Sequence, residues 1–126
     1  MLTGKAKEDF EKWICSKSVK EFALNYLEMT QKKFSNQINL SILNAFNCSP
    51  FSMQYGVYVD FFDSVGIKIS ISDMNEKYIY CVTFPIISEY GITDTFISPN
   101  INTRTEARQK AIEKANEIYN EQKKMP

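Results

Sequence analysis

The 126-residue chain contains no histidine. Histidine is the commonest general base and the commonest metal ligand, so its absence removes the usual triad and zinc chemistries. Glycine-rich phosphate loops, GxSxG nucleophile elbows and CxxC pairs are absent as well. The sequence therefore predicts a protein that is not an enzyme, with no catalytic residue, no metal and no cofactor.

Cysteine is sparse and scattered, at Cys15, Cys48 and Cys81. An odd number of distant cysteines is typical of small buried side chains in a reducing compartment. No apolar run approaches the length that spans a bilayer, and the N-terminus MLTGKAKEDFEKW turns charged where a signal peptide needs its apolar region. We expect a cytoplasmic protein that does not associate with membranes.

Charge of one sign is also lacking, because 15 basic residues balance 15 acidic ones. Residues 36–102 hold two basic residues against six acidic ones, and the segments on either side are mildly basic. Nucleic-acid binders usually carry a basic excess, since phosphate neutralisation supplies most of their affinity. The balance therefore favours a protein partner over a nucleic acid.

Hydrophobic residues make up 44% of the chain and charged residues 24%, which are values typical of globular domains. We predict a single domain over 1–126. It consists of a helical part (1–49), a mixed part (50–122) and a short tail (123–126).

The first part shows helical spacing of apolar residues. Thr3 is placed to cap a helix over about 4–16, and the capping-box spacing of Ser18 and Glu21 predicts the start of a second helix. The apolar residues of that second helix are Val19, Phe22, Ala23, Tyr26, Leu27 and Phe34. A short third helix is predicted from 38 to 46.

The segment PFSMQYGVYVDFFDSVG allows two interpretations. The favoured one is a helix capped by Ser52 and ended by Gly66, on which Asp60 and Asp63 share a narrow polar strip. The rival is a strand over 55–62, which the aromatic and β-branched content would suit.

After Gly66 the period of apolar residues becomes two, as Ile67, Ile69 and Ile71 alternate with polar residues. The turn DMNE leads to a second strand, KYIYCVTF, whose ladder Pro85 should limit. The turn SEYG leads to a third, ITDTFIS. Strands joined this closely predict an antiparallel meander.

The segment TRTEARQKAIEKANEIYN predicts a last helix that opens with a capping box at Thr103 and Glu106. Its apolar face consists of Ala107, Ala111, Ile112, Ala115, Ile118 and Tyr119. The predicted fold class is α+β, a three-stranded antiparallel meander flanked by helices in the order α-β-β-β-α. Additional N-terminal helices pack beside or beneath it.

Arg104 and Arg108 are candidate anion or nucleic-acid contacts, because both fall within the apolar stripe at the start of the last helix. Arginines there can extend past the sheet edge, pair with a carboxylate such as Asp94 or Asp63, or bind an external anion beside the free helix amides. We favour the carboxylate pairing over phosphate contact.

Two further sets of residues are candidates. Asp60 and Asp63 could share a cation or act as an acid–base pair, but the favoured interpretation is a strip that faces water or a partner. Tyr78 and Tyr80 share one face of the second strand and would stack on bases if that face were open. The favoured alternative is that both are half-buried in the sheet.

Residues 52–122 resemble the double-stranded-RNA-binding domain, which has the same order of a helix, three strands and a helix. That family opens its last helix with a basic-basic-x-Ala-basic run and then paired small residues. The matching residues here are Arg104, Thr105, Ala107, Arg108, Ala111 and Ile112. The sequence departs from the family at Thr105, and in the turn DMNE, where the family has a Gly-Pro-x-His-type loop. The resemblance implies RNA contact at the start of the last helix.

A second resemblance covers nearly the whole chain. The segments LTGKAKEDFEKW, SMQYGVYVDFFDSVGI and TRTEARQKAIEKANEIYN together resemble small uncharacterised proteins carried by phages and prophages of Bacteroides-type gut bacteria. That likeness implies an accessory protein acting in the host cytoplasm, against a defence system or a host enzyme.

Three functions follow in order of preference. The first is a non-enzymatic module that binds a host or phage protein, with self-association as a further alternative. The second is binding of a nucleic-acid backbone through Arg104 and Arg108. The third is metal- or carboxylate-dependent hydrolysis at Asp60 and Asp63.

Overall fold

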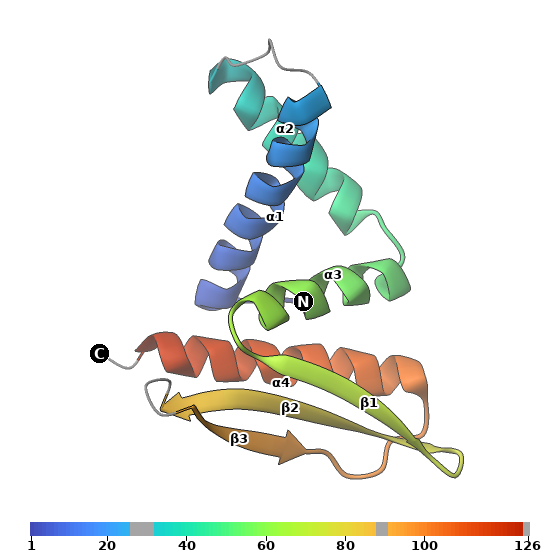
Figure 1. Cartoon of the computed structure of the whole chain (residues 1–126). Helices are drawn as coiled ribbons and strands as arrows, with labels where there is room; N and C mark the ends of the chain where they lie inside the picture. Colours follow the sequence, from blue (N-terminus) through green and yellow to red (C-terminus); the bar gives the residue numbers. More distant parts are fainter. Residues whose placement is uncertain (26–31, 88–90, 125–126) are drawn as a thin grey trace.

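The computed structural model describes residues 1–25, 32–87 and 91–124, which form four helices and three strands. The elements are α1 (Gly4–Asn25), α2 (Lys32–Asn47), α3 (Phe51–Ser64), β1 (Lys68–Met74), β2 (Lys77–Ile87), β3 (Ile92–Ile97) and α4 (Arg104–Lys124) (Figure 1). The predicted α+β class and its α-β-β-β-α order are confirmed. Residues 55–62 are helical, so the rival strand interpretation is wrong.

The strands form one antiparallel sheet in the order β1-β2-β3. Asn75 and Glu76 have φ angles of 51° and 68°, which identify the β1–β2 connection as a two-residue turn of the I′ type. β2 runs through Pro85 and shifts register just beyond it, so the ladder with β3 continues past the proline while the ladder with β1 stops at Thr83. The predicted SEYG turn falls partly on residues 88–90, which lie outside the described residues.

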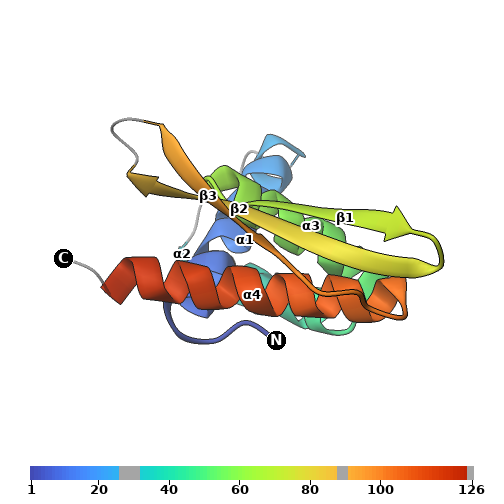
Figure 2. The ribbon, with the colours of Figure 1, turned by 90° about the horizontal axis from the view of Figure 1, so that it is seen from below.

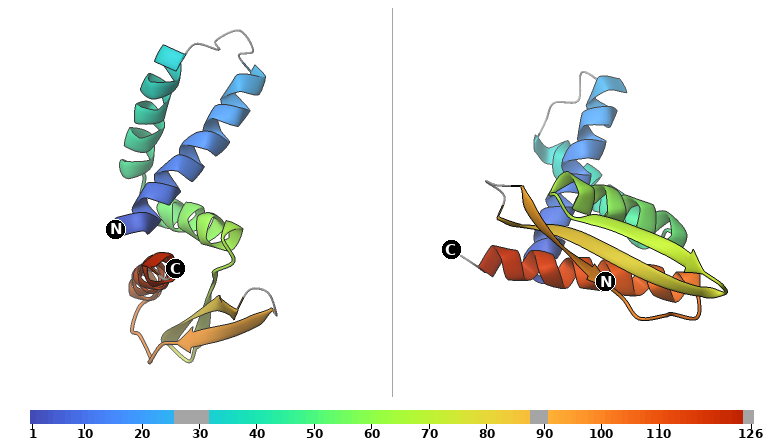
Figure 3. Two further views of the ribbon diagram at one scale, coloured as in Figure 1. Left: turned by 90° about the vertical axis from the view of Figure 1, so that its left-hand side faces the viewer. Right: turned by 60° about the horizontal axis from the view of Figure 1, so that its bottom comes forward.

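Both helices of the C-terminal part cover the same face of the sheet. α4 packs against β2 and β1, and α3 packs against β1 and α4. α1 and α2 lie on the far side of α3 and α4 from the sheet (Figures 1 and 3). The N-terminal helices therefore pack beside the other helices and do not lie beneath the sheet.

The apolar face of α4 is the one that its spacing predicts. All six predicted residues are buried, four of them with no exposed surface. Thr103 caps the helix, because its Oγ1 accepts a hydrogen bond from the backbone N–H of Glu106 at 3.1 Å. The helix continues to Lys124, so the first two residues of the predicted tail are helical.

The C-terminal end of α3 forms a Schellman motif. Gly66 has a φ of 87°, its N–H bonds to the carbonyl of Asp63, and the N–H of Ile67 bonds to the carbonyl of Phe62. Ile67 and Phe62 are both fully buried, as this motif favours. At the other end, Pro50 and not Ser52 precedes the helix, and it provides no side-chain cap.

α1 is one helix where the sequence predicts two. Ser18 lies in its interior, so the predicted capping box there is wrong. No glycine or proline lies between the predicted helix over 4–16 and Ser18, so no helix breaker separates the two helices that the sequence predicts there. The predicted third helix is the second half of α2, and the predicted apolar residues Tyr26 and Leu27 lie outside the described residues.

The N-terminus of α1 is capped by α4. The Oδ1 of Asn120 accepts a hydrogen bond from the N–H of Ala6 at 2.8 Å, and its Nδ2 donates to the carbonyl of Thr3 at 2.9 Å. The Thr3 hydroxyl instead accepts a hydrogen bond from Nδ2 of Asn116 at 3.1 Å. The predicted cap by Thr3 is therefore replaced by a cap from a residue far along the chain.

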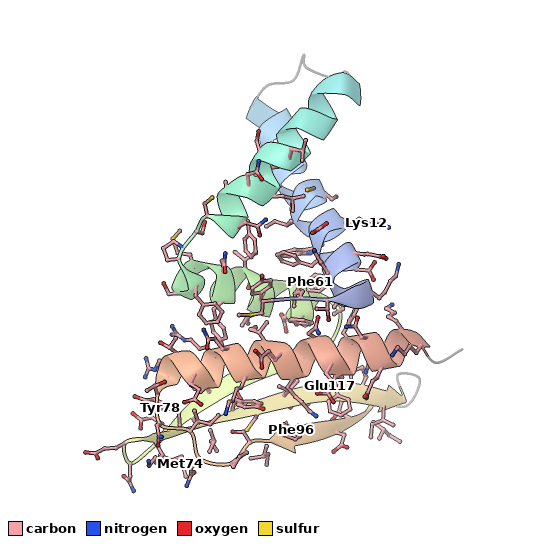
Figure 4. All side chains as sticks on the ribbon, turned by 180° about the vertical axis from the view of Figure 1, so that it is seen from behind. Lys12, Phe61, Met74, Tyr78, Phe96 and Glu117 are labelled. Carbon is pink, nitrogen blue, oxygen red and sulfur yellow. The ribbon has the colours of Figure 1, made fainter. Side chains whose placement is uncertain are left out.

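One hydrophobic core joins the predicted N-terminal and C-terminal parts. At its centre the ring of Phe10 lies 5.1 Å from that of Phe46, 4.9 Å from that of Tyr58 and 5.4 Å from that of Phe61. Figure 4 shows Phe61 between α3 and α1. This aromatic cluster attaches the first two helices to the rest of the molecule.

Candidate functional site

Arg104 and Arg108 each lie over a tyrosine ring. The guanidinium carbon of Arg104 is 5.5 Å from the ring centroid of Tyr78, and that of Arg108 is 5.0 Å from the centroid of Tyr55. Figure 4 shows Tyr78 beside the N-terminal end of α4. Stacking of a guanidinium on an aromatic ring is favourable and leaves its N–H groups free to bond elsewhere.

The favoured pairing of these arginines with Asp94 or Asp63 is wrong. Among the described residues, neither guanidinium forms an ion pair with any carboxylate. Asp94 instead lines a groove beside the second half of α4, and Asp63 belongs to the C-terminal end of α3. Both carboxylates belong to parts of the fold remote from the first turn of α4.

The start of α4 therefore keeps positive charge that no described carboxylate pairs with. Its positive groups are Arg104, Arg108 and Lys77, whose ammonium donates to the Oδ1 of Asn102. Glu106 in the same turn pairs with Lys110 at 3.2 Å, so its charge is partly balanced within the helix. The arrangement offers guanidinium donors beside a helix N-terminus, the chemistry that a phosphate or carboxylate favours.

Tyr80 does not lie on an open face. It is buried under α4, and its ring is 5.8 Å from that of Phe96. The base-stacking interpretation is therefore wrong for Tyr80. Tyr78 is half-buried beneath Arg104, which agrees with the favoured alternative.

Asp60 and Asp63 are both exposed on α3, on the predicted polar strip. Across residues 1–25, 32–87 and 91–124, no group of three or more cysteine, aspartate or glutamate side chains is placed to hold a metal ion. A role for the two aspartates toward a partner stays a prediction.

The sheet has one face that no described helix covers, here called the open face. By register, Ser70, Cys81 and Ile97 lie side by side across the three strands, and Ser72 lies opposite Ile79. Ile97 is 62% exposed. Thr83 and Thr95 share a hydrogen bond of 3.1 Å between their hydroxyls on the same face.

The open face was not predicted from the sequence. The alternation in β1 indicates a polar face, but β2 places Ile79 and Cys81 on that same face and β3 adds Ile97. The available signal was that these three residues occupy alternate positions of their strands, whose side chains point to one face. It becomes informative only with the register of the strands, which sequence alone does not supply.

A groove of about 320 Å³ separates β3 from the second half of α4. β2 passes close to α4, whereas β3 begins further from it (Figures 1 and 2). The apolar lining includes Phe84, Phe96 and Ile118, and the polar lining includes Asp94, Lys114, Glu121 and Gln122. Sequence reasoning did not find this groove either, because its walls come from three separate elements.

Comparison with known proteins adds no relative. No family model, no curated protein and no solved structure matches the chain. Among the helices that the structure describes, none combines the length and the apolar content that crossing a membrane requires.

Proposed function

We propose that this chain is a non-enzymatic binding module whose partner is a protein. The partner would contact the open face of the sheet and its edge strand β3. The observation that carries the proposal is the open face itself. An antiparallel sheet with one solvated face normally keeps that face polar. Here the edge strand places Ile97, 62% exposed, beside the half-buried Cys81, with the half-buried Ile79 on the same face, and exposed apolar side chains that cluster in this way mark interaction sites.

The charges around the open face also favour a protein partner. Lys68 and Lys77 lie toward its two ends, and the rows between them hold serine, threonine, cysteine and isoleucine. Two isolated lysines are too few to supply the phosphate neutralisation on which nucleic-acid affinity depends. A partner that packs on apolar and hydroxyl side chains would bind with weak dependence on salt.

The resemblance to phage- and prophage-carried proteins supplies the setting for this proposal. It supports a partner inside a bacterial host cell, either a host enzyme or a component of a defence system. Binding alone would suffice to block such a target, so no catalytic residue is needed.

A tagged pull-down from lysate of a Bacteroides-type gut bacterium tests this function. One half of the lysate is treated with nuclease, and Ile97→Asp is compared with wild type. Met53→Asp is the matched control, because Met53 is 65% exposed on α3, away from the sheet. We expect a stoichiometric protein that survives nuclease, is retained by the control and is lost with Ile97→Asp. A partner lost on nuclease treatment, or retained equally by both variants, would contradict the proposal.

A second candidate function is binding of a nucleic-acid backbone at the start of α4. The observation that favours it is that Arg104 and Arg108 lie over tyrosine rings and pair with no described carboxylate. Fluorescence anisotropy with a labelled RNA duplex tests it, using Lys124→Ala as a control at the other end of α4. This function requires affinity that falls steeply with salt and falls again in Arg108→Ala. An Arg108→Ala protein that unfolds would instead make the arginine a structural residue.

A further inference from the structure

The outer edge of β3 presents backbone groups that pair with no other strand of the described sheet. The N–H of Ser98 donates to the carbonyl of Tyr80 at 3.0 Å, which fixes the phase of the β2–β3 ladder. Because bonded and non-bonded pairs alternate along an antiparallel ladder, the backbone groups of Thr93, Thr95 and Ile97 point away from β2. Such an edge can accept another strand.

The central N–H of this edge is held by a carboxylate of the same strand. The N–H of Thr95 donates to the Oδ1 of Asp94 at 2.8 Å. An incoming strand that bonded to Thr95 would have to displace the Asp94 carboxylate. A lysine or arginine of that strand, placed beside Asp94, would form an ion pair with the carboxylate and replace the lost hydrogen bond.

The groove between β3 and α4 borders this same edge and has an acidic rim. Asp94 and Glu121 line it, and the ammonium of Lys114 is 3.6 Å from the carboxylate of Glu117 and 4.3 Å from the ring centroid of Phe96. The groove is therefore lined by two carboxylates and one ammonium, and that ammonium already pairs with Glu117 outside the lining. The floor is apolar, and Phe96 lies on the α4 side of the sheet, because its ring contacts Lys114 of α4.

The size of the groove limits what it can hold. Its volume of about 320 Å³ lies at the lower end of the range of roughly 300–1,000 Å³ for ligand pockets. An apolar side chain with a neighbouring basic one suits such a site better than a large cofactor.

We propose that β3 accepts a fourth strand, an extended segment of the partner protein with an apolar residue and a lysine or arginine two positions apart. Both side chains would face the groove, since residues two apart in a strand share a face. The apolar one would pack near Phe96, and the basic one would pair with Asp94 and Glu121. The N–H of Thr95 would then join the ladder. This inference rests on the proposed protein-binding function and names the chemistry of the segment that is bound.

A second copy of the chain fits this edge less well. Two β3 strands paired edge to edge would bring two acid-rimmed grooves together, and like charges in contact oppose association. Charge complementarity therefore selects a basic segment from another protein.

The test uses random dodecapeptides displayed on phage, selected against the full chain. We expect the selected peptides to share an apolar residue and a basic residue two positions apart. A synthetic peptide of the selected sequence is then titrated against variants by fluorescence anisotropy. Thr95→Pro, which removes the outward N–H, should weaken binding about tenfold. Asp73→Pro, the matched change on the outer edge of β1, should leave it unchanged.

A second variant, which changes only a charge, is needed because Thr95→Pro could also affect folding of the sheet. Glu121→Gln changes one exposed side chain and should weaken the basic peptide about threefold. Glu113→Gln, an exposed change on the same helix away from the groove, is its control.

Three outcomes would overturn the inference. The first is that no peptide is enriched. The second is that the selected peptides bind Thr95→Pro and Glu121→Gln as they bind wild type, which would place them on another surface and leave the protein-binding function standing. The third is a wild-type dimer, seen by sedimentation, that Thr95→Pro dissociates. Failure of the protein-binding function itself would show separately, as the loss of any nuclease-resistant partner in the pull-down.

Discussion

The hydroxyl of Tyr119, near the end of α4, donates a hydrogen bond to the carboxylate of Asp9 in α1. This bond, with a smaller contribution from Lys5 at 3.3 Å, holds the pKa of Asp9 below its usual value. Burial, and then the Asp9 carboxylate, raise the pKa of Tyr119 far above that of a free tyrosine. The contact joins the first helix to the last one, on the side of α4 that faces away from the sheet.

Tyr119→Phe removes the donor of this bond and keeps the ring. We expect the free energy of unfolding at pH 7 to fall by about 1–2 kcal/mol, because a hydrogen bond to a charged group is lost. Urea denaturation measures it. Tyr78→Phe is the control and should change the value by less than about 0.5 kcal/mol, since no described bond involves its hydroxyl. Equal losses in the two variants would contradict the assigned role.

The shifted pKa values of Asp9 and Tyr119 predict how the stability of the protein depends on pH. The pKa of Asp9 is lower in the folded state than in the unfolded state, so the ionised carboxylate stabilises the fold. This stabilisation is fully present at a pH above the pKa of Asp9 in the unfolded chain, and it is lost as the pH falls through the pKa in the folded protein. The pKa of Tyr119 is higher in the folded state, so its contribution is present below pH ~10 and is lost above it. We expect the urea midpoint of unfolding to decrease both at acidic pH, where Asp9 becomes protonated, and at alkaline pH above ~10. In Tyr119→Phe both declines should be shallower, and unchanged declines would assign the pH dependence to other groups.

Gly66 and Gly56 form a matched pair of helix glycines with opposite expected effects. Gly66→Ala forces a side chain onto a φ of 87° and should destabilise the protein by about 1 kcal/mol or more. Gly56→Ala lies inside α3, where an added Cβ meets nothing within 4 Å, and should stabilise it by about 0.5–1 kcal/mol. Thermal unfolding of the two variants checks the signs. Changes of the same sign would show that α3 does not end at Gly66 as described.

Asn120→Ala removes the cap that α4 provides to α1. The N–H of Ala6 would lose its acceptor, and the free energy of unfolding should fall by about 1–2 kcal/mol. Amide hydrogen exchange should quicken in the first turn of α1 above all. Asn100→Ala, an exposed change between β3 and α4, serves as the control. Uniform acceleration along the whole chain would mean that Asn120 acts on global packing and not as a cap.

The sequence was sufficient for the parts of the fold that local periodicity determines. The six-residue apolar face of α4, the glycine that ends α3 and the alternation in β1 all depend on residues within a few positions of one another. For the same reason the α+β class and the meander could be predicted from the sequence alone.

The errors arose where distant residues decide the structure. Asn120 caps a helix that begins more than a hundred positions earlier, and the sequence offered Thr3 as the nearer candidate. Arg104 and Arg108 stack on Tyr78 and Tyr55, because the expected carboxylates belong to other parts of the fold. The open face and the groove likewise depend on strand register and on the path of β3, which local patterns leave undetermined.

Photo-crosslinking from position 97 gives the most direct test of whether a protein binds the open face. A benzophenone amino acid replaces Ile97 on the open face or, as the control, Met53 on α3, and each protein is irradiated in host lysate. Protein binding at the open face predicts one discrete protein adduct from position 97, insensitive to nuclease, and none from position 53. No adduct from position 97, equal adducts from both positions, or an adduct that nuclease removes would contradict it.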